Sequence, residues 1–150
     1  MDLILWRHAE AEAGEPDMGR RLTGKGTKQA ERMSVWLDAH LPDTCRILVS
    51  PADRAQQTAQ ALNRKFRTVA ELAPGASLAA VLSAANWPES REPVLIVGHQ
   101  PTLGMVASFL LSGEEAYWSI RKGAVWWLSN RAKEDGASVV LKSVQSADFL

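Results

Sequence analysis

The chain has 150 residues, of which 46% are hydrophobic and 23% are charged, a composition typical of a soluble globular protein. Its 17 basic and 17 acidic residues give a formal net charge of zero, which offers no basic patch for binding nucleic acid or a membrane surface. The length suits one domain over residues 1–150. The single cysteine, Cys45, excludes an intrachain disulfide and is expected to be a buried, unreactive side chain.

The apolar stretches of the chain are too short to cross a membrane. No run reaches the ~18 apolar residues of a membrane span. The N-terminal apolar run is interrupted by Arg7 and His8, too early for a secretory signal. We therefore expect a cytoplasmic protein, and we expect it to be a monomer.

Apolar periodicity and turn residues predict alternating strands and helices over the first 112 residues. Thr23 is expected to cap the first helix. Ser50 is expected to cap the second helix, with Pro51 at its first position and Asp53 completing the cap. Pro101 is expected at the first position of the last of these helices. The expected strands cover 2–6, 46–49, 66–70 and 93–97, and the expected helices cover 25–40, 51–62, 77–85 and 101–112.

The end of the chain follows a different pattern. Residues 124–129 and 138–144 are expected to be two strands, joined by a hairpin loop over 130–136 that contains an Asp-Gly pair. The strand–helix alternation ahead of this hairpin predicts an α/β fold of three layers, α/β/α, with a mixed but mostly parallel central sheet. The hairpin places an antiparallel strand at or near one edge of that sheet.

Charged side chains follow three of the expected strands. Arg7 and His8 come directly after the first strand, and His99 follows the fourth. Arg54 lies in the first turn of the helix after the second strand. The C-terminal ends of parallel strands meet at one edge of a sheet, where open α/β proteins bind ligands. We therefore expect these four side chains to form one site.

This set of side chains suits phosphate chemistry. Arg7 and Arg54 can each hold phosphoryl oxygens through two N–H groups, and a protonated histidine can add another donor. A neutral histidine can attack phosphorus and form a phosphoenzyme, which water then hydrolyses. The arginines neutralise the developing charge, so this chemistry needs no metal and no cofactor. A metal site at His8 and His99 is the rival interpretation, but the sequence shows no third ligand at the usual spacing.

Four segments of the chain resemble the sequence motifs of the histidine phosphatase superfamily, and they occur in the family's order. They are residues 5–11 (LWRHAEA), which resemble the RHG or RHA motif; residues 20–26 (RRLTGKG), which resemble R-x-L-T-x-x-G; residues 49–59 (VSPADRAQQTA), which resemble S-P-x-x-R-x-x-Q-T-A; and residues 97–101 (VGHQP), which resemble G-H-x-P. The short chain and the RHAEA form resemble the SixA-like phosphohistidine phosphatase branch.

The resemblance implies a phosphoglycerate-mutase-like fold and a role for each matching residue. His8 would be the nucleophile that becomes phosphorylated. Arg7, Arg54 and His99 would bind the phosphate. Arg20 matches the arginine of the second motif and would also reach the phosphate.

Two features of the resemblance leave alternatives open. Arg20 could equally be an ordinary surface arginine, and the neighbouring Arg21 could take its role. Ala9 stands where the RHG form has glycine, which would cost stability if the turn required a positive φ.

The residue that would protonate the leaving group also stays open. Many members of the superfamily use a glutamate or aspartate for this step. Glu71 is one candidate by position, Glu10 and Glu12 are others, and the chain could also have none. A phosphohistidine substrate would tolerate a missing acid, because its P–N bond breaks easily once the imidazole is protonated.

The leading prediction is a metal-independent phosphatase that acts through phosphorylated His8 on phosphohistidine of a signalling or carrier protein. Only 44 residues separate Arg54 from His99, which leaves little chain for a lid over the pocket. An open pocket favours a protein substrate, because a protein can add contacts around the rim. A small phosphate ester such as a sugar phosphate is the alternative substrate, and a non-catalytic phosphate-binding module is the alternative function.

Overall fold

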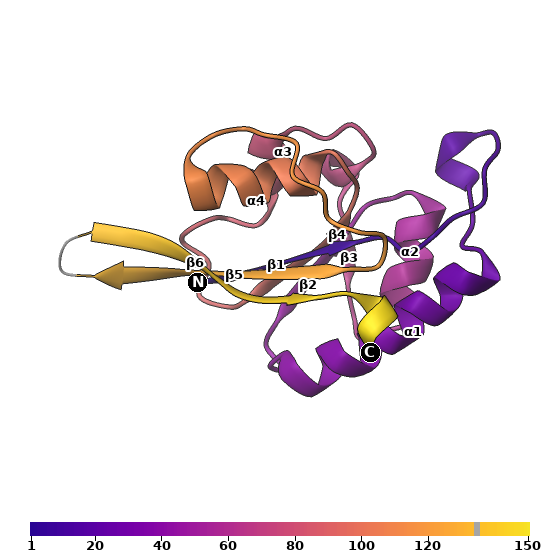
Figure 1. Ribbon diagram of the computed structural model, residues 1–150, viewed down its shortest axis with the longest axis horizontal. Coiled ribbons are helices and arrows are strands. Elements are labelled where there is room, and N and C mark those ends of the chain that lie inside the picture. The colour runs from indigo at the N-terminus through magenta and orange to yellow at the C-terminus, as the bar shows by residue number, and fades with distance from the viewer. Residues whose placement is uncertain (134–135) are drawn as a thin grey trace.

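The computed structural model describes residues 1–133 and 136–150, which form a six-stranded sheet with helices on both faces (Figure 1). The strands are β1 (Asp2–Arg7), β2 (Arg46–Val49), β3 (Arg67–Thr68), β4 (Val94–Gly98), β5 (Val125–Lys133) and β6 (Gly136–Gln145). The helices are α1 (Gly24–His40), α2 (Asp53–Gln60), α3 (Leu78–Ala84) and α4 (Thr102–Ser112). Short 3-10 turns are η1 (Asp17–Gly19), η2 (Ala70–Leu72) and η3 (Ala147–Phe149).

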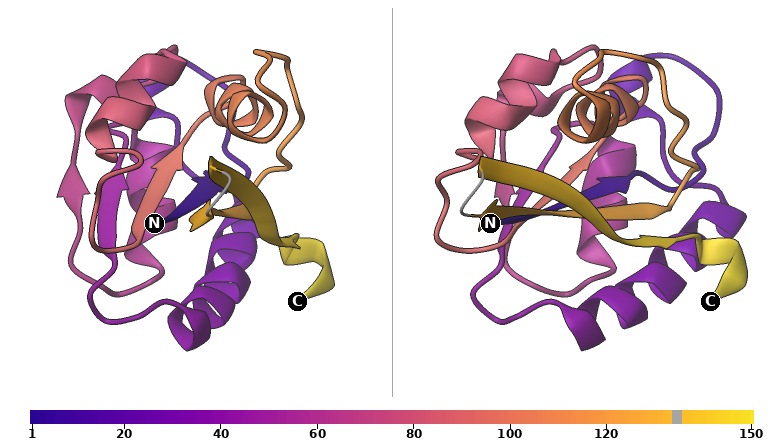
Figure 2. Two further views of the ribbon diagram at one scale, coloured as in Figure 1. Left: turned by 90° about the vertical axis from the view of Figure 1, so that its left-hand side faces the viewer. Right: turned by 60° about the vertical axis from the view of Figure 1, so that its left-hand side comes forward.

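The sheet is mixed and its strand order is β3-β2-β4-β1-β5-β6. Strand β4 pairs in parallel with β1 and β2, and β2 pairs in parallel with β3. Strand β5 runs antiparallel to β1, and β6 runs antiparallel to β5 along the edge (Figure 2). The predicted three-layer α/β/α fold with a mostly parallel sheet is confirmed, including the antiparallel strands at one edge.

The central strands are buried on both faces, which explains their unbroken apolar runs. In β1, Leu5 packs with side chains of α3 and α4 such as Leu103, whereas Ile4 packs with side chains of α1 and α2 such as Leu37. All four side chains are at most 1% exposed. Burial of such a side chain contributes about 1.5–3 kcal/mol to folding. The end of β1 is therefore a rigid base for the residues that follow it.

The predicted helices are present, and two of their termini are as expected. Thr23 caps α1 by accepting a hydrogen bond from the N–H of Gly26 (2.9 Å). Gly113 ends α4 in the left-handed conformation, with φ of 81°. Among the described residues, no helix combines the length and the apolar character that crossing a membrane requires.

The predicted start of α2 is wrong. The helix begins at Asp53 with Ala52 as its N-cap, and no side chain caps it. The hydroxyl of Ser50 instead lies 2.7 Å from the imidazole of His99, on the neighbouring strand's end. Pro101 likewise is the N-cap residue of α4 and not its first helical residue.

The hairpin is longer than predicted, because its strands extend into the expected loop. Asn130 and Arg131 lie within β5 and pair with Val139 and Ser138 of β6. Backbone hydrogen bonds alone can extend an edge hairpin into solvent, so polar side chains do not end it. The Asp-Gly pair of the predicted hairpin loop falls partly on residues 134–135, which lie outside the described residues. At the opposite edge, the strand predicted over 66–70 is reduced to β3.

Candidate active site

A hollow of about 190 Å³ lies where β1, β2 and β4 end. It brings together all four residues that the sequence placed in one site, and Arg20 as well. The lining residues are Arg7, His8, Ala11, Arg20, Arg54, Pro74, His99, Gln100 and Lys122. Arg21 is not among them, so of the two adjacent arginines the structure places Arg20 at the hollow.

His8 follows β1 directly and is 8% exposed. Its backbone N–H donates to the carbonyl of Gly98 (3.0 Å), which ties the end of β1 to the end of β4. Its Nδ1 lies 2.7 Å from the carbonyl of Ala9 and must donate there, because a carbonyl only accepts. Burial, followed by the charges of Arg54 and Arg7, lowers the pKa of His8 to about 4. At neutral pH the imidazole is therefore uncharged, with a lone pair on Nε2.

Arg54 lies in the first turn of α2 and is 4% exposed. Its Nε donates toward Nε2 of His8 at 3.4 Å. Its Nη1 donates to the carbonyl of Asp17 (2.8 Å), and its Nη2 donates to the carboxylate of Asp17 (3.2 Å). Arg54 therefore joins the histidine to η1.

Asp17 pairs with two arginines of the hollow, and the sequence did not single it out. Its carboxylate accepts from Arg20 (3.0 Å) as well as from Arg54. Hydrogen bonds from Arg20 and Arg54 lower the pKa of Asp17, so it is a carboxylate at neutral pH. The spacing of Asp17 and Arg20 could have suggested their pairing, but nothing in the sequence linked Asp17 to Arg54.

Arg7 lines the hollow with a guanidinium that has no carboxylate partner among the described residues. Its Nη1 donates to the carbonyl of Ile120 (2.9 Å), while its Nε is buried and has no acceptor among the described residues. No carboxylate of the described residues lies within 4.0 Å of its guanidinium. Burial lowers the pKa of Arg7, yet an arginine stays charged at any physiological pH. An anion in the hollow would satisfy this charge.

His99 follows β4 and is 5% exposed, with its ring centroid 5.1 Å from that of His8. Its Nε2 lies 2.7 Å from the hydroxyl oxygen of Ser50. That oxygen also accepts from the N–H of Ala52 (3.2 Å), so Ser50 links the His99 ring to the backbone before α2. Burial, followed by the nearby His8 and Arg54, lowers the pKa of His99 to about 3. The ring is thus a neutral imidazole that the Ser50 hydroxyl holds in place.

We expect Ser50→Ala to lower kcat about tenfold, because His99 loses its only side-chain hydrogen bond among the described residues, and to cost about 1 kcal/mol of stability. Ser77→Ala is the matched control, since the hydroxyl of Ser77 caps α3 by accepting from Ala80 (3.0 Å) and Ser77 does not line the hollow. The control should lose similar stability and keep its kcat. Equal kcat values for the two variants would contradict the role of Ser50.

The stability of the protein should fall as the pH drops from about 6.5 to about 4. In this window an unfolded His8, with its pKa near 6.5, binds a proton that the native His8, with its pKa of about 4, does not. Urea unfolding of wild type and His8→Asn should show a shallower pH dependence in the variant, by at most about 1.4 kcal/mol per pH unit. Parallel curves for the two proteins would mean that native His8 titrates normally.

Thr58 joins the loop after His8 to α2. Its hydroxyl accepts from the N–H of Ala9 (3.0 Å) and donates to the carbonyl of Arg54 (2.7 Å). Ala9 is fully buried and does not have a positive φ. Alanine therefore replaces the glycine of the RHG motif here without backbone strain. Thr58 is the threonine of the third motif, and that match was the available signal for its role.

None of the three proposed acids lines the hollow. Glu10 accepts a hydrogen bond from the hydroxyl of Thr23 (2.8 Å) and faces a neighbouring hollow. Glu12 lines a separate hollow on the loop before α1, and Glu71 is exposed in η2. Among the described residues the hollow is lined by cationic, neutral polar and apolar side chains and by no carboxylate.

Gln100 and Lys122 line the hollow although the sequence did not single them out. Gln100 donates to the carbonyl of Trp118 (2.8 Å) and accepts from the N–H of Gly104 (2.7 Å), which fixes the segment before β5 against α4. A Cβ at Gly104 would collide with the Trp118 carbonyl, so the approach requires glycine. Lys122 reaches the hollow from this segment, which looked like an ordinary connection.

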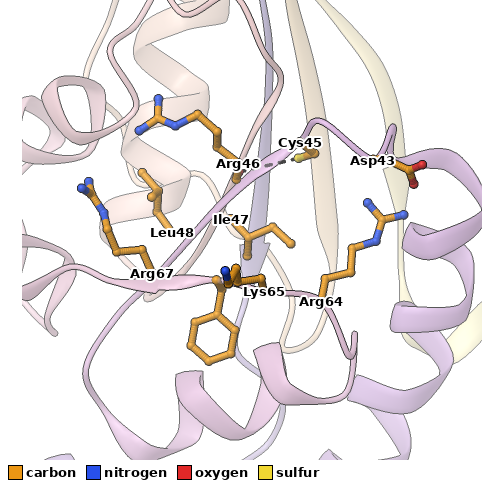
Figure 3. A pocket seen from close by; sticks show the side chains of 9 residues that line it. Asp43, Cys45, Arg46, Ile47, Leu48, Arg64, Lys65 and Arg67 are labelled. Atoms are coloured by element: carbon orange, nitrogen blue, oxygen red, sulfur yellow. Dashed lines mark hydrogen bonds between the residues drawn. The ribbon is translucent and has the colours of Figure 1, made fainter.

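A larger hollow of about 590 Å³ lies at the other edge of the sheet, beside β2 and β3 (Figure 3). Three of its cations, Arg46, Lys65 and Arg67, make no ion pair with the described residues. Arg67 lies on the edge strand β3, where a basic side chain discourages pairing with another chain. Cys45 lines this hollow, and burial raises the pKa of its thiol to about 11, in keeping with an unreactive side chain.

Comparison with known proteins agrees with this geometry. The family model of the histidine phosphatase superfamily (branch 1) matches residues 3–77, half of the chain. The phosphohistidine phosphatase SixA homolog of Haemophilus influenzae is 33% identical over 126 residues, which cover 73% of this chain and 77% of that protein. The phosphohistidine phosphatase SixA of Escherichia coli is 29% identical over 123 residues and 76% of each chain.

The fold is shared with solved structures as well. The structure of the protein histidine phosphatase SixA complexed with tungstate matches with a TM-score of 0.77 at 23% identity, over 99% of both chains. The segment that the family model matches carries Arg7, His8 and Arg54. The chain therefore belongs to branch 1 of the histidine phosphatase superfamily.

Proposed function

We propose that this phosphatase hydrolyses phosphohistidine on a protein, without a metal ion, through an intermediate in which His8 is phosphorylated. The observation that carries the proposal is the state of His8. Its Nδ1 donates to the Ala9 carbonyl, its pKa of about 4 keeps the ring neutral, and its Nε2 faces Arg54. A neutral imidazole surrounded by guanidinium groups is a nucleophile placed at an anion site.

The proposed reaction has two displacements at phosphorus. Arg7 and Arg54 hold the phosphoryl oxygens, and the lone pair on Nε2 of His8 attacks phosphorus in line. The substrate imidazole takes a proton from solvent on its other nitrogen, the P–N bond breaks, and the ring leaves as a neutral imidazole with the bond's electron pair. Water then attacks phospho-His8, which gives inorganic phosphate and returns neutral His8. No net oxidation occurs, and the arginines neutralise the charge on the transferring group in both steps.

The lining of the hollow supports phosphohistidine over a phosphate ester. An alkoxide leaving group needs a proton donor, whereas an imidazole has an ordinary pKa near 6.5 and leaves readily once protonated. Among the described residues no carboxylate lines the hollow, and Asp17 is held ionised by Arg20 and Arg54. The two relatives named as phosphohistidine phosphatases support the same substrate.

The test compares three substrates at matched enzyme concentration: a phosphohistidine-bearing carrier domain, a sugar phosphate and p-nitrophenyl phosphate. We expect kcat/KM on the phosphohistidine domain to exceed that on the sugar phosphate by at least tenfold, about 1.4 kcal/mol in the transition state. Activity should survive EDTA and fall with vanadate. A tenfold preference for the sugar phosphate would favour the small-ester alternative, and absence of any turnover would leave a phosphate-binding module.

A further inference from the structure

A second hollow of about 310 Å³ adjoins the first one and shares Arg7 and Lys122 with it. The shared side chains form the wall between the two spaces, so a group in the second hollow lies beside a phosphoryl group in the first. Its other lining residues are Glu10, Lys25 and Gln29 from β1's end and α1, Arg121 before β5, and Asp148 of η3.

The side chains that line the second hollow include more cations than carboxylates. Arg121 is paired with Asp148 (3.3 Å), and the Glu10 carboxylate already accepts from the Thr23 hydroxyl. Lys25 and Lys122 are exposed, and neither has a carboxylate within 4.0 Å among the described residues. With Arg7 in the shared wall, three cations without a carboxylate partner face this space, in a chain whose net charge is zero.

Gln29 adds a rigid polar group to the floor of this hollow. It is 7% exposed, and its Oε1 accepts from the backbone N–H of Glu10 (3.0 Å), which fixes the amide plane. Its Nε2 has no protein partner among the described residues. A hollow lined by a fixed amide donor and by two lysines without carboxylate partners among the described residues suits a carboxylate better than a neutral hydroxyl group.

We propose that the second hollow is a specificity subsite that binds an acidic side chain next to the phosphohistidine of the protein substrate. This inference rests on the proposed function, since it places the acidic group relative to a phosphoryl group in the first hollow. Lys25 and Lys122 attract the acidic side chain of the protein substrate as it approaches, and they bind its carboxylate once it enters the subsite. A phosphorylated substrate that has no acidic group beside its phosphate leaves the subsite empty and gains no affinity from it.

The probes are two synthetic peptides with a central phosphohistidine, one flanked by aspartate and glutamate and the other by asparagine and glutamine. Wild type should prefer the acidic peptide at least tenfold in kcat/KM. Lys25→Glu should reduce this preference below threefold, because Lys25 lines only the second hollow. Its turnover of p-nitrophenyl phosphate should stay unchanged.

Lys28→Glu is the matched control, because it makes the same charge change on the exposed surface of α1, three residues away and outside both hollows. It should keep the full preference for the acidic peptide. Equal loss in both lysine variants would show general charge attraction, and an unchanged preference in Lys25→Glu would exclude the subsite. Either result overturns the proposal.

Peptide binding to His8→Asn separates this proposal from the proposed function. The Kd values of both peptides, measured by calorimetry, report the subsite even if neither peptide is hydrolysed. A tenfold Kd ratio that Lys25→Glu removes, without turnover of either peptide by wild type, would keep the subsite and refute the phosphohistidine substrate. Equal Kd values together with normal turnover would refute the subsite and keep the substrate.

Discussion

Replacement of His8 by asparagine should lower kcat at least about a thousandfold, because it removes the nucleophile from the hollow. Asparagine has a similar volume, and its amide N–H can still donate to the Ala9 carbonyl that Nδ1 of His8 holds at 2.7 Å. The hydrogen bond from the backbone N–H of residue 8 to the Gly98 carbonyl is also kept. Turnover of p-nitrophenyl phosphate and thermal unfolding of the variant measure the two effects separately.

His40→Asn is the matched control for this substitution. The Nδ1 of His40 also lies 2.7 Å from a carbonyl, that of Trp36, but on the exposed surface of α1. This variant should keep its kcat. Rapid quenching of wild type with labelled substrate should trap a phosphoenzyme that is labile in acid and stable in alkali. A label on serine, cysteine or a carboxylate would remove His8 from its role.

Arg54→Ala should lower kcat/KM by a few hundredfold, which corresponds to the ~3–4 kcal/mol lost with one donor of an oxyanion site. The side chain is 4% exposed and joins Nε2 of His8 to Asp17 through three nitrogen atoms. Arg54→Lys should recover only part of the loss, because one ammonium group cannot reach both partners in a fixed plane. Steady-state kinetics of the three proteins measure the series.

Arg64→Ala controls for the loss of a well-connected guanidinium. Arg64 pairs with Asp38 (2.9 Å) and donates to the carbonyls of Leu41 and Pro42, away from the hollow. This variant should lose stability and keep its kcat/KM. If Arg54→Ala retained more than a third of the wild-type kcat/KM, Arg54 would not bind the transferring group.

The central part of the fold could be predicted because its sequence signal is local. Strands such as β4 are apolar at every position, and this pattern indicates burial on both faces. Gly113 marks a helix end through its backbone freedom, and Thr23 marks one through its capping hydroxyl, so both signals are local. The extent of the β5–β6 hairpin could not be predicted, because backbone pairing continues past Asn130 through residues that lack the alternating apolar pattern of a strand.

In the candidate site, too, the residues with a local sequence signal could be predicted and those with distant partners could not. His8 and His99 were placed together because each follows a strand, and the family resemblance that their motifs suggested is confirmed. Ser50 was misinterpreted as a helix cap, because its partner His99 is 49 residues away in the sequence. Nothing in the sequence indicated that Lys122 lines the hollow. The segment that carries it matches no motif, and it is fixed by hydrogen bonds to its backbone carbonyls.

The contact between Asp17 and Arg54 keeps two donors of a lining guanidinium occupied, although Asp17 itself does not line the hollow. The carboxylate and carbonyl of Asp17 occupy both Nη atoms of Arg54, while the Nε atom remains directed at His8. In the proposed reaction, a phosphoryl group must therefore displace Asp17 wherever it needs those donors. When inorganic phosphate departs, the tethered carboxylate returns to the same place. Each exchange lowers the net affinity for free phosphate, so this arrangement favours product release.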